Sequence, residues 1–247
     1  MDVAVVIPTY NEAATIAAVV QRGCRQVDWV IVVDDGSEDA TAVQLKELPA
    51  MVLRHEDNQG KAASLWDGMQ LALAQGAKAV ITLDADGQHC PEDIPRLLAA
   101  GQRYPAALII AARLHGWERS PWLRRLANRI ADFWISWAAG CPIADTQSGF
   151  RLYPAVVCRL PIGHDRRHGF VFESEILIEA ARHGYYPIAV PIKARYSRQG
   201  RCSYYQPLRD TVRITRMVAW KLLSRGLYPL GLLRSLRLLT LFDTPSL

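Results

Sequence analysis

Short runs of consecutive apolar residues alternate with amphipathic stretches along the first half of the chain. Four such runs lie at residues 3–7, 29–33, 79–83 and 107–112. Continuous apolar runs of this length are typical of strands buried on both faces of a sheet. The stretches between them are rich in helix-forming residues and end with Gly or a polar turn, at 12–23, 61–76 and 91–102. This alternation predicts an α/β fold with a mostly parallel, Rossmann-like sheet flanked by helices.

The second half of the chain is less regular. It predicts a helix at 172–184, an extended segment at 186–196 and a helical tail from residue 207. On a helix, Arg209, Arg213 and Arg216 share one face with Trp220. This pattern indicates either an interfacial element with basic anchors or a helix packed on the domain with a solvated basic face. We therefore predict a globular domain at 1–206 and a basic helical extension at 207–247.

Composition and the cysteines favour a cytoplasmic protein. Half of the 247 residues are hydrophobic, and the five cysteines are dispersed with no CxxC pair, so neither a disulfide framework nor a zinc knuckle is predicted. No charged-then-apolar leader precedes the first strand, so secretion is not expected. The longest uncharged apolar stretch, at 133–144, is too short to cross a bilayer and is interpreted as a buried helix and its exit.

The net charge of +5 is unevenly distributed. Nine Lys or Arg residues lie between Arg198 and Thr240, against the single acidic residue Asp210. Such asymmetry predicts an anionic partner for the tail, either a membrane surface or nucleic acid. The chain shows no helix-turn-helix, zinc finger or aromatic stacking platform, so we expect no nucleic-acid partner and a peripheral association with an anionic membrane.

Polar clusters follow three of the predicted strands. They read PTYNE after the first, DDGSED after the second and DADGQ after the run at 79–83. Parallel sheets bind ligands beyond the carboxyl ends of their strands, so the three clusters should face one crevice. Neither GxGxxG nor GxxxxGK[ST] occurs, which excludes a dinucleotide fingerprint and a P-loop.

The DADGQ cluster predicts a metal site. Asp84 and Asp86 can both reach one hard cation, Mg²⁺ or Mn²⁺, and Gln88 offers a further oxygen. The alternative is a turn that caps the next helix, which explains Glu92 and Asp93. Capping does not explain Asp84 and Asp86, because burying two like charges together is costly without a cation.

The other two clusters suit a nucleotide. Ser37 or Asp39 can cap a helix, whereas an acidic residue at a strand end, such as Asp35, can accept hydrogen bonds from a base or ribose. Tyr10 and Glu12 combine an aromatic face with a carboxylate, which suits a nucleobase. Lys61 is either a phosphate or base contact or a surface lysine.

Several motifs in order resemble glycosyltransferase family 2, specifically its dolichyl-phosphate mannose synthase-like group. The resemblance covers about residues 3–203 and rests on IPTYNE, VVDDGSEDAT, NQGKAASLWDGMQLA, DADGQ with PEDI, and DTQSGFRLY. It implies a GT-A fold in which a nucleotide-sugar binds across the carboxyl edge of the sheet. Tyr204 and Ala62 depart from the family pattern, where Lys and Gly are usual.

The resemblance also implies roles for individual residues. The nucleoside would be held by Pro8, Tyr10, Glu12, Val33 and Asp35, and the diphosphate-bound metal by Asp84, Asp86 and Gln88. Arg113 and Arg129 look like the arginines placed near the donor and acceptor phosphates, and with Asp86 they are the expected catalytic residues. Further binding residues would be Lys61, Ser148 and Arg198.

The expected reaction is inverting, metal-dependent transfer of a hexose from a GDP- or UDP-linked sugar to a polyprenyl phosphate. A phosphate acceptor is already anionic and needs no strong base, whereas a hydroxyl acceptor must lose a proton. In the alternative, a sugar or small-lipid hydroxyl is the acceptor and Asp145 is the base. A nucleotidyltransferase would carry a Gly-rich basic loop after the first strand, and PTYNEAAT is no such loop. A non-catalytic module would lack the metal residues, which are present.

Overall fold

The computed structural model describes residues 2–115, 122–162, 169–193 and 207–238. The strands are β1 (Val3–Thr9), β2 (Val30–Asp34), β3 (Met51–Arg54), β4 (Ala79–Thr82), β5 (Leu108–His115), β6 (Arg151–Pro154) and β7 (Pro187–Lys193). The α-helices are α1 (Ile16–Cys24), α2 (Thr41–Leu45), α3 (Lys61–Ala74), α4 (Ile94–Arg103), α5 (Trp122–Ala139), α6 (Ala155–Cys158), α7 (Gly169–Arg182), α8 (Pro207–Leu223) and α9 (Pro229–Ser235). A short 3₁₀ turn, η1 (Pro91–Asp93), precedes α4.

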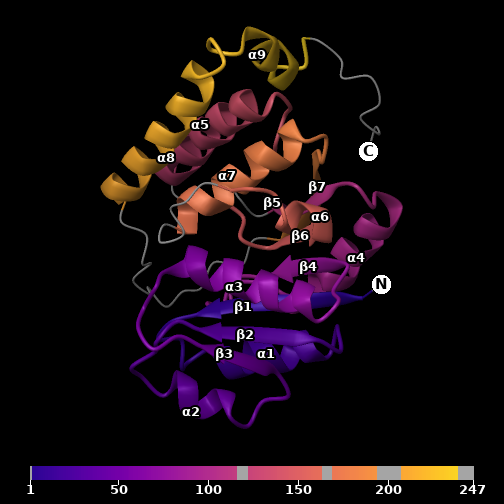
Figure 1. Ribbon diagram of the computed structural model, residues 1–247, viewed down its shortest axis with the longest axis vertical. Coiled ribbons are helices and arrows are strands. Elements are labelled where there is room, and N and C mark those ends of the chain that lie inside the picture. Colours follow the sequence, from indigo (N-terminus) through magenta and orange to yellow (C-terminus); the bar gives the residue numbers. More distant parts are fainter. Residues whose placement is uncertain (1, 116–121, 163–168, 194–206, 239–247) are drawn as a thin grey trace.

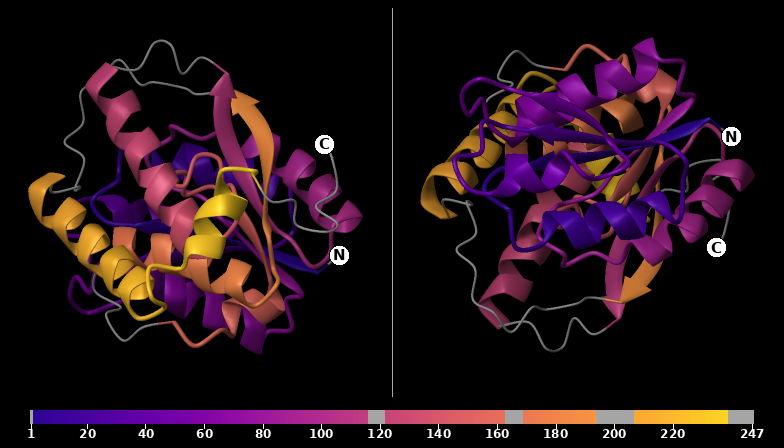
Figure 2. Two further views of the ribbon diagram at one scale, coloured as in Figure 1. Left: turned by 90° about the horizontal axis from the view of Figure 1, so that it is seen from above. Right: turned by 90° about the horizontal axis from the view of Figure 1, so that it is seen from below.

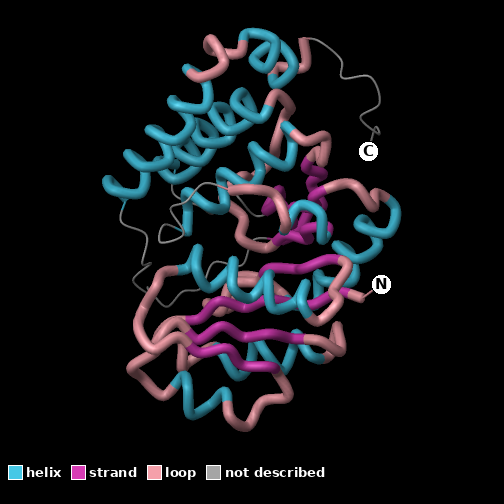
Figure 3. Tube along the Cα trace, viewed as in Figure 1, coloured by secondary structure: helices cyan, strands magenta, loops and turns pink. Residues whose placement is uncertain are grey.

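The seven strands of the described residues form one sheet in the order β3-β2-β1-β4-β6-β5-β7. Figure 3 shows the strands in magenta. Pairing is parallel throughout except around β6, which runs antiparallel to β4 and β5. The mostly parallel sheet and the four strands predicted from apolar runs are confirmed. The pattern did not predict β3, because this short edge strand exposes Met51 and Val52 and therefore carries no buried apolar run.

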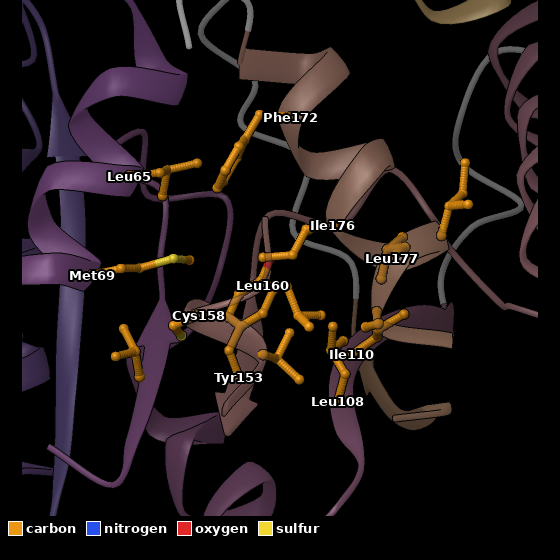
Figure 4. Packing of buried hydrophobic residues seen from close by; sticks show 14 of the residues in the cluster. Leu65, Met69, Leu108, Ile110, Tyr153, Cys158, Leu160, Phe172, Ile176 and Leu177 are labelled. Atoms are coloured by element: carbon orange, nitrogen blue, oxygen red, sulfur yellow. The ribbon is translucent and has the colours of Figure 1, made fainter. Parts of the chain in front are cut away.

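Helices cover both faces of the sheet. Side chains alternate along β1, so Ala4 and Val6 pack on one face with α3, α5 and α7. Val5 and Ile7 pack on the opposite face with α1, α2 and α4. Figure 4 shows the first core at close range, with Met69 of α3 facing the α7 side chains. This double cover explains why the strands read as continuous apolar runs.

The prediction of a buried helix and its exit at residues 133–144 is wrong in part, because residues 133–139 belong to the longer, amphipathic helix α5. The helix begins earlier, at Trp122, and only one of its faces is buried, through residues such as Ile135 and Ala138. Phe133 is 39% exposed and Trp134 43% exposed. The error arose because the apolar window covered only the second half of an amphipathic helix.

Helices α8 and α9 lie beside α5 and α7 at one end of the molecule, with α1 and α2 at the other (Figure 1). Val218 and Leu222 of α8 are buried, whereas Trp220 and Leu223 are 72% and 64% exposed. The helix is therefore packed on the body and at the same time presents apolar side chains outward. Within the described part of the chain, no helix is both long enough and apolar enough to span a membrane.

Candidate active site

The loops after β1 and β2 are joined side by side at the carboxyl edge of the sheet. Asn11 lies in the left-handed region, with φ of 54°, and its Oδ1 accepts hydrogen bonds from the backbone N–H groups of Glu38 and Asp39 at 2.9 and 3.3 Å. Its own N–H donates to Ser37 Oγ at 2.9 Å. Sequence reasoning missed Asn11, although Asn is among the few residues that tolerate this conformation. The joined loops fix where Tyr10 and Glu12 stand.

Asp35 is a buried carboxylate, and each of its two oxygens contacts hydrogen-bonding groups of the protein. Oδ1 contacts His55 Nδ1 at 2.7 Å and accepts from the N–H of Gln59 at 2.9 Å, and Oδ2 accepts from the N–H of Gly60 at 2.8 Å. Asp35 thereby holds the segment that leads into α3 against the end of β2. Its contact with a nucleoside stays a prediction. Asp34 instead pairs with Arg54 at 2.9 Å.

Lys61, the first residue of α3, bridges two carboxylates from distant parts of the chain. Its Nζ lies 2.7 Å from Asp84 Oδ1 and 3.3 Å from Glu173 Oε2 of α7. Burial would lower the pKa of Lys61, but the two carboxylates outweigh burial and raise that pKa above its usual value. Burial in turn would raise the pKa of Asp84, yet Lys61 holds it below its usual range. Lys61 therefore belongs to the site and is not a surface lysine.

Asp86 lies in an acidic environment close to Asp84. Burial raises the pKa of Asp86, and the charges of Asp84 and Glu12 raise it further. Its Oδ1 accepts a hydrogen bond from the N–H of Gln88 at 2.9 Å. The loops after β1 and β4 thus bring Glu12, Asp84 and Asp86 into one electrostatic neighbourhood, as the strand-end argument predicted.

The side-chain oxygens of Asp84, Asp86 and Gln88 suit a hard divalent cation. Among the described residues, no group of three or more His, Cys, Asp or Glu side chains is already arranged around a common metal position. Asp84 nevertheless already takes a cationic partner, Lys61, and the carboxylate of Asp86 is destabilised by neighbouring negative charge, which a cation would relieve. Carboxylate and amide oxygens from Asp84, Asp86 and Gln88 are the ligands that Mg²⁺ and Mn²⁺ prefer.

Gly149 lies directly against Asp84. A Cβ atom at Gly149 would lie 2.5 Å from Asp84 Oδ2, so only glycine leaves room for this carboxylate. Thr82 Oγ1 donates to the Gly149 carbonyl at 2.7 Å, which fixes the loop at residues 145–149 beside the end of β4. The segment DTQSG and the segment DADGQ therefore form one wall of the site.

Arg113 of β5 and Asp145 form a bidentate ion pair. The Nε and Nη2 atoms of Arg113 lie 2.9 and 2.7 Å from the Asp145 oxygens, and the Arg113 N–H donates to Oδ2 at 2.8 Å. Burial would raise the pKa of Asp145, but Arg113 lowers it below its usual range. A carboxylate held in this way is a weak base, which counts against Asp145 as the base of a hydroxyl-acceptor reaction.

Two buried residues that sequence reasoning missed shape the same wall. Arg151 is fully buried, and it donates to the carbonyls of Thr146 and Glu173 at 2.7 and 2.6 Å. His89 lies 4.0 Å from Asp84 Oδ2, and burial lowers its pKa to about 4, so it is neutral at pH 7. Their sequence signal was weak, because part of their contacts join distant residues: Arg151 donates to Glu173, and the His89 ring lies 5.5 Å from the ring of Phe150.

The remaining predicted residues fall into three groups. Pro8, Val33 and Ser148 are buried, and Ser148 Oγ donates to the Ala111 carbonyl at 2.8 Å, so these three residues support the strands and loops of the site. Tyr10 is half-buried in the loop after β1, and Arg129 is exposed on α5. Arg198 lies outside the described residues. Ligand contacts of all these residues stay predictions.

Comparison with known proteins matches the chain to one protein family and to individual relatives. The family model for Glycosyl transferase family 2 matches residues 4–157. Polyprenol monophosphomannose synthase from Mycolicibacterium smegmatis is 30% identical over 207 residues, covering 76% of this chain and 75% of that protein. UDP-N-acetylglucosamine–dolichyl-phosphate N-acetylglucosaminyltransferase from Methanococcus voltae is 28% identical over 213 residues, covering 78% and 85%.

Solved structures share the fold. Glucosyl-3-phosphoglycerate synthase from Mycobacterium tuberculosis in complex with uridine diphosphate is 25% identical, with a TM-score of 0.65, and the match covers 90% of this chain and 79% of that one. The same protein in complex with Mn²⁺, UDP-glucose and phosphoglyceric acid matches with a TM-score of 0.65 at 23% identity. The GT-A architecture expected from the sequence is thereby confirmed.

Proposed function

Because the chain belongs to glycosyl transferase family 2 and is a glycosyltransferase, we propose that it transfers a hexose from a nucleotide-sugar to a polyprenyl phosphate with inversion. The observation that carries the proposal is the convergence of Glu12, Asp84, Asp86 and Lys61 with the Arg113–Asp145 pair at one edge of the sheet. Carboxylates for a cation and basic groups for phosphates are what such a transfer needs.

On the donor side, Asp84, Asp86 and Gln88 would hold Mg²⁺ or Mn²⁺. The cation would neutralise the charge that develops on the departing nucleoside diphosphate. In this proposal Tyr10 and Glu12 contact the nucleoside, and Pro8, Val33 and Asp35 would support them from β1, β2 and the loop that follows β2. The donor is a GDP- or UDP-linked sugar in this proposal.

On the acceptor side, the low basicity of Asp145 favours a nucleophile that is already anionic. An oxygen of the lipid phosphate attacks the anomeric carbon, the bond from that carbon to the diphosphate oxygen breaks, and the nucleoside diphosphate leaves with the electron pair. Asp145 fixes the Arg113 guanidinium through two hydrogen bonds. Arg113, with Arg129 one helical turn before Asp132, would position the phosphates rather than move a proton.

Two of the relatives, from Mycolicibacterium smegmatis and Methanococcus voltae, carry polyprenol or dolichyl-phosphate in their names, so in this proposal the acceptor headgroup lies at a membrane surface. We place the enzyme in the cytoplasm as a peripheral membrane protein. Residues 207–247 would supply the contact, with Arg216 and Trp220 exposed on α8. Each basic side chain near an anionic surface contributes roughly 1 kcal/mol to such binding.

A donor panel tests the proposal. Radiolabelled GDP- and UDP-sugars are incubated with the purified protein, Mn²⁺ or Mg²⁺, and a polyprenyl phosphate in detergent, and label is counted in the organic phase. We expect label in the lipid from one donor, and its loss with EDTA or with Asp86→Ala. Donor hydrolysis that depends on metal, without lipid labelling, would refute the lipid acceptor while keeping the donor site.

A further inference from the structure

An apolar groove runs between α5 and α8, separate from the charged site. It encloses about 350 Å³. Ile130 and Trp134 of α5 form one wall, and Ile214 and Val218 of α8 form the other. Ile130 and Trp134 are 50% and 43% exposed, so the groove opens to the outside. Seen from above, both helices lie on the same side of the molecule (Figure 2).

The groove ends at the loop that forms the wall of the charged site. Gln147 is one of its lining residues, and its Nε2 donates to Thr146 Oγ1 at 3.2 Å. Asp132 of α5 accepts from both the N–H and the Oγ1 of Thr146, at 2.8 and 2.6 Å. Gly149, where an added Cβ would lie 2.5 Å from Asp84 Oδ2, follows two residues after Gln147. One short loop, fixed to α5, thus separates the apolar groove from the predicted metal ligands.

The lining defines the chemistry of the ligand. No residue that lines the groove is charged, and its polar members are Asn128, Thr215 and Gln147. A sugar or a nucleotide would lose hydrogen bonds there, whereas a hydrocarbon chain loses none. Arg129 lies on α5 between two lining residues, Asn128 and Ile130. A basic group beside an apolar channel suits an amphiphile with an anionic head and a long hydrocarbon tail.

We propose that this groove binds the hydrocarbon chain of the acceptor, the isoprene units nearest the phosphate. The inference rests on the proposed function and deepens it, because it assigns the chain a site on the protein in addition to the headgroup site. The chain enters from the membrane, lies between α5 and α8, and places its phosphate at the Gln147 end, next to Asp84 and Arg113. Each methylene group buried there strengthens binding about fourfold, so the groove selects long-chain acceptors.

A pair of substitutions on α8 tests the groove. Ala219→Phe fills it, because Ala219 lines the groove, whereas Val212→Phe adds similar bulk to an exposed position on the same helix that does not line it. We measure kcat/KM with an isoprenyl phosphate of two units and with one of eleven units. The wild type and Val212→Phe should favour the long chain, and Ala219→Phe should lose at least about tenfold of that preference while keeping its activity on the short chain.

Photocrosslinking provides a readout that needs no catalysis. An isoprenyl phosphate with a diazirine on its first isoprene units should label peptides containing residues 127–135 and 214–219, and Ala219→Phe should abolish this labelling. Labelling confined to other peptides, or an unchanged chain-length preference in Ala219→Phe, would overturn the groove assignment. A dimer in sedimentation that Ala219→Phe dissociates would overturn it too, because a second copy of the chain would then cover the groove.

The two proposals fail in different ways. If no isoprenyl phosphate of either length accepts sugar but the groove peptides are crosslinked, the proposed reaction is wrong and the lipid site remains. If both acceptors are glycosylated and the groove peptides are not labelled, the reaction remains and the groove assignment is wrong.

Discussion

At the scale of single residues, the site depends on how one carboxylate, Asp84, is held. Lys61 neutralises it from α3, Gly149 gives it room, and His89 stays neutral beside it because burial lowers the His89 pKa to about 4. These contacts orient Asp84 before any ligand arrives. The orientation of a ligand residue by its neighbours is a large part of metal affinity.

Gly149→Ala should therefore weaken metal binding without unfolding the protein. The new methyl group would approach Asp84 Oδ2 to 2.5 Å and displace the carboxylate. We expect Mn²⁺ affinity, measured by electron paramagnetic resonance of free Mn²⁺, to fall roughly tenfold to a hundredfold. Gly23→Ala is the matched control, because a Cβ there meets only Val30 at 3.9 Å. Unchanged Mn²⁺ affinity in Gly149→Ala would show that Asp84 is not a ligand.

The sequence identified residues of the candidate site, but it did not show which side chains they contact. Asp84, Asp86, Glu12 and Lys61 could be selected because each follows a strand or opens a helix at the expected edge. The link from Lys61 to Glu173 joins residues 112 positions apart, and no local pattern reports such a contact. The same reason hid the roles of Arg151 and His89, which depend on the folded arrangement of β6, α7 and the loop after β4.

At the scale of elements, α8 is attached to the body by a partly buried ion-pair cluster. Lys221 Nζ lies 2.8 Å from Glu175 and 2.6 Å from Glu179, and these side chains are only 14–15% exposed. From the spacing of the charges along α8 alone, two interpretations were equally good: a helix packed on the domain with a solvated basic face, and an interfacial helix. The structure shows why spacing could not decide, since Lys221 faces α7 while Trp220, its neighbour in sequence, faces outward.

Lys221→Met should destabilise the protein by about 2 kcal/mol at pH 7, because the partly buried Glu175 and Glu179 lose the ammonium group that they share, while Glu179 keeps Arg182 at 3.2 Å. Urea unfolding measures the change, and Lys78→Met, which breaks the exposed pair with Asp2, should change stability little. A Lys221→Met protein as stable as the wild type would contradict the attachment of α8 by this cluster.

The same cluster predicts a pH dependence. Burial would raise the pKa of Glu179, but Lys221 lowers it below the ordinary value of 4.5. A lowered folded-state pKa contributes stability above the unfolded pKa, and this contribution is lost as pH falls through the folded value. The difference in the free energy of unfolding between wild type and Lys221→Met should therefore have its full value above about pH 5 and should become smaller at lower pH. A gap that stays constant down to pH 3 would argue against an ionic origin.

At the scale of the whole molecule, a charged site lies near a helical end that exposes apolar side chains, which is the arrangement that the proposed amphiphilic acceptor requires. The carboxyl edge of the sheet carries the charged residues of the site, and exposed apolar and basic side chains lie on α8. Helices α5, α8 and α9 lie together at one end of the molecule (Figure 1). The sequence predicted the sheet and the basic tail. It could not predict the groove, which forms only when α5 and α8 come together.

Membrane binding should depend on that end of the molecule. Arg216→Gln removes one exposed charge from α8 and should weaken binding to anionic vesicles about fivefold at low salt. Arg25→Gln makes the same change after α1, at the opposite end, and should have no effect. Cosedimentation with vesicles at several salt concentrations gives both values. Equal binding of the two variants, or no binding at low salt, would refute membrane contact through α8.

The proposed reaction requires that the acceptor nucleophile is a phosphate. The most direct measurement offers the enzyme a polyprenyl phosphate and the corresponding polyprenol, identical except for the phosphate, with its labelled donor and Mn²⁺. We expect label only in the polyprenyl phosphate, and at a rate that Asp145→Asn lowers through loss of Arg113 positioning without changing its pH dependence. Label on the polyprenol, with a rate that rises with pH through a single ionisation lost in Asp145→Asn, would contradict the phosphate acceptor and identify Asp145 as a base.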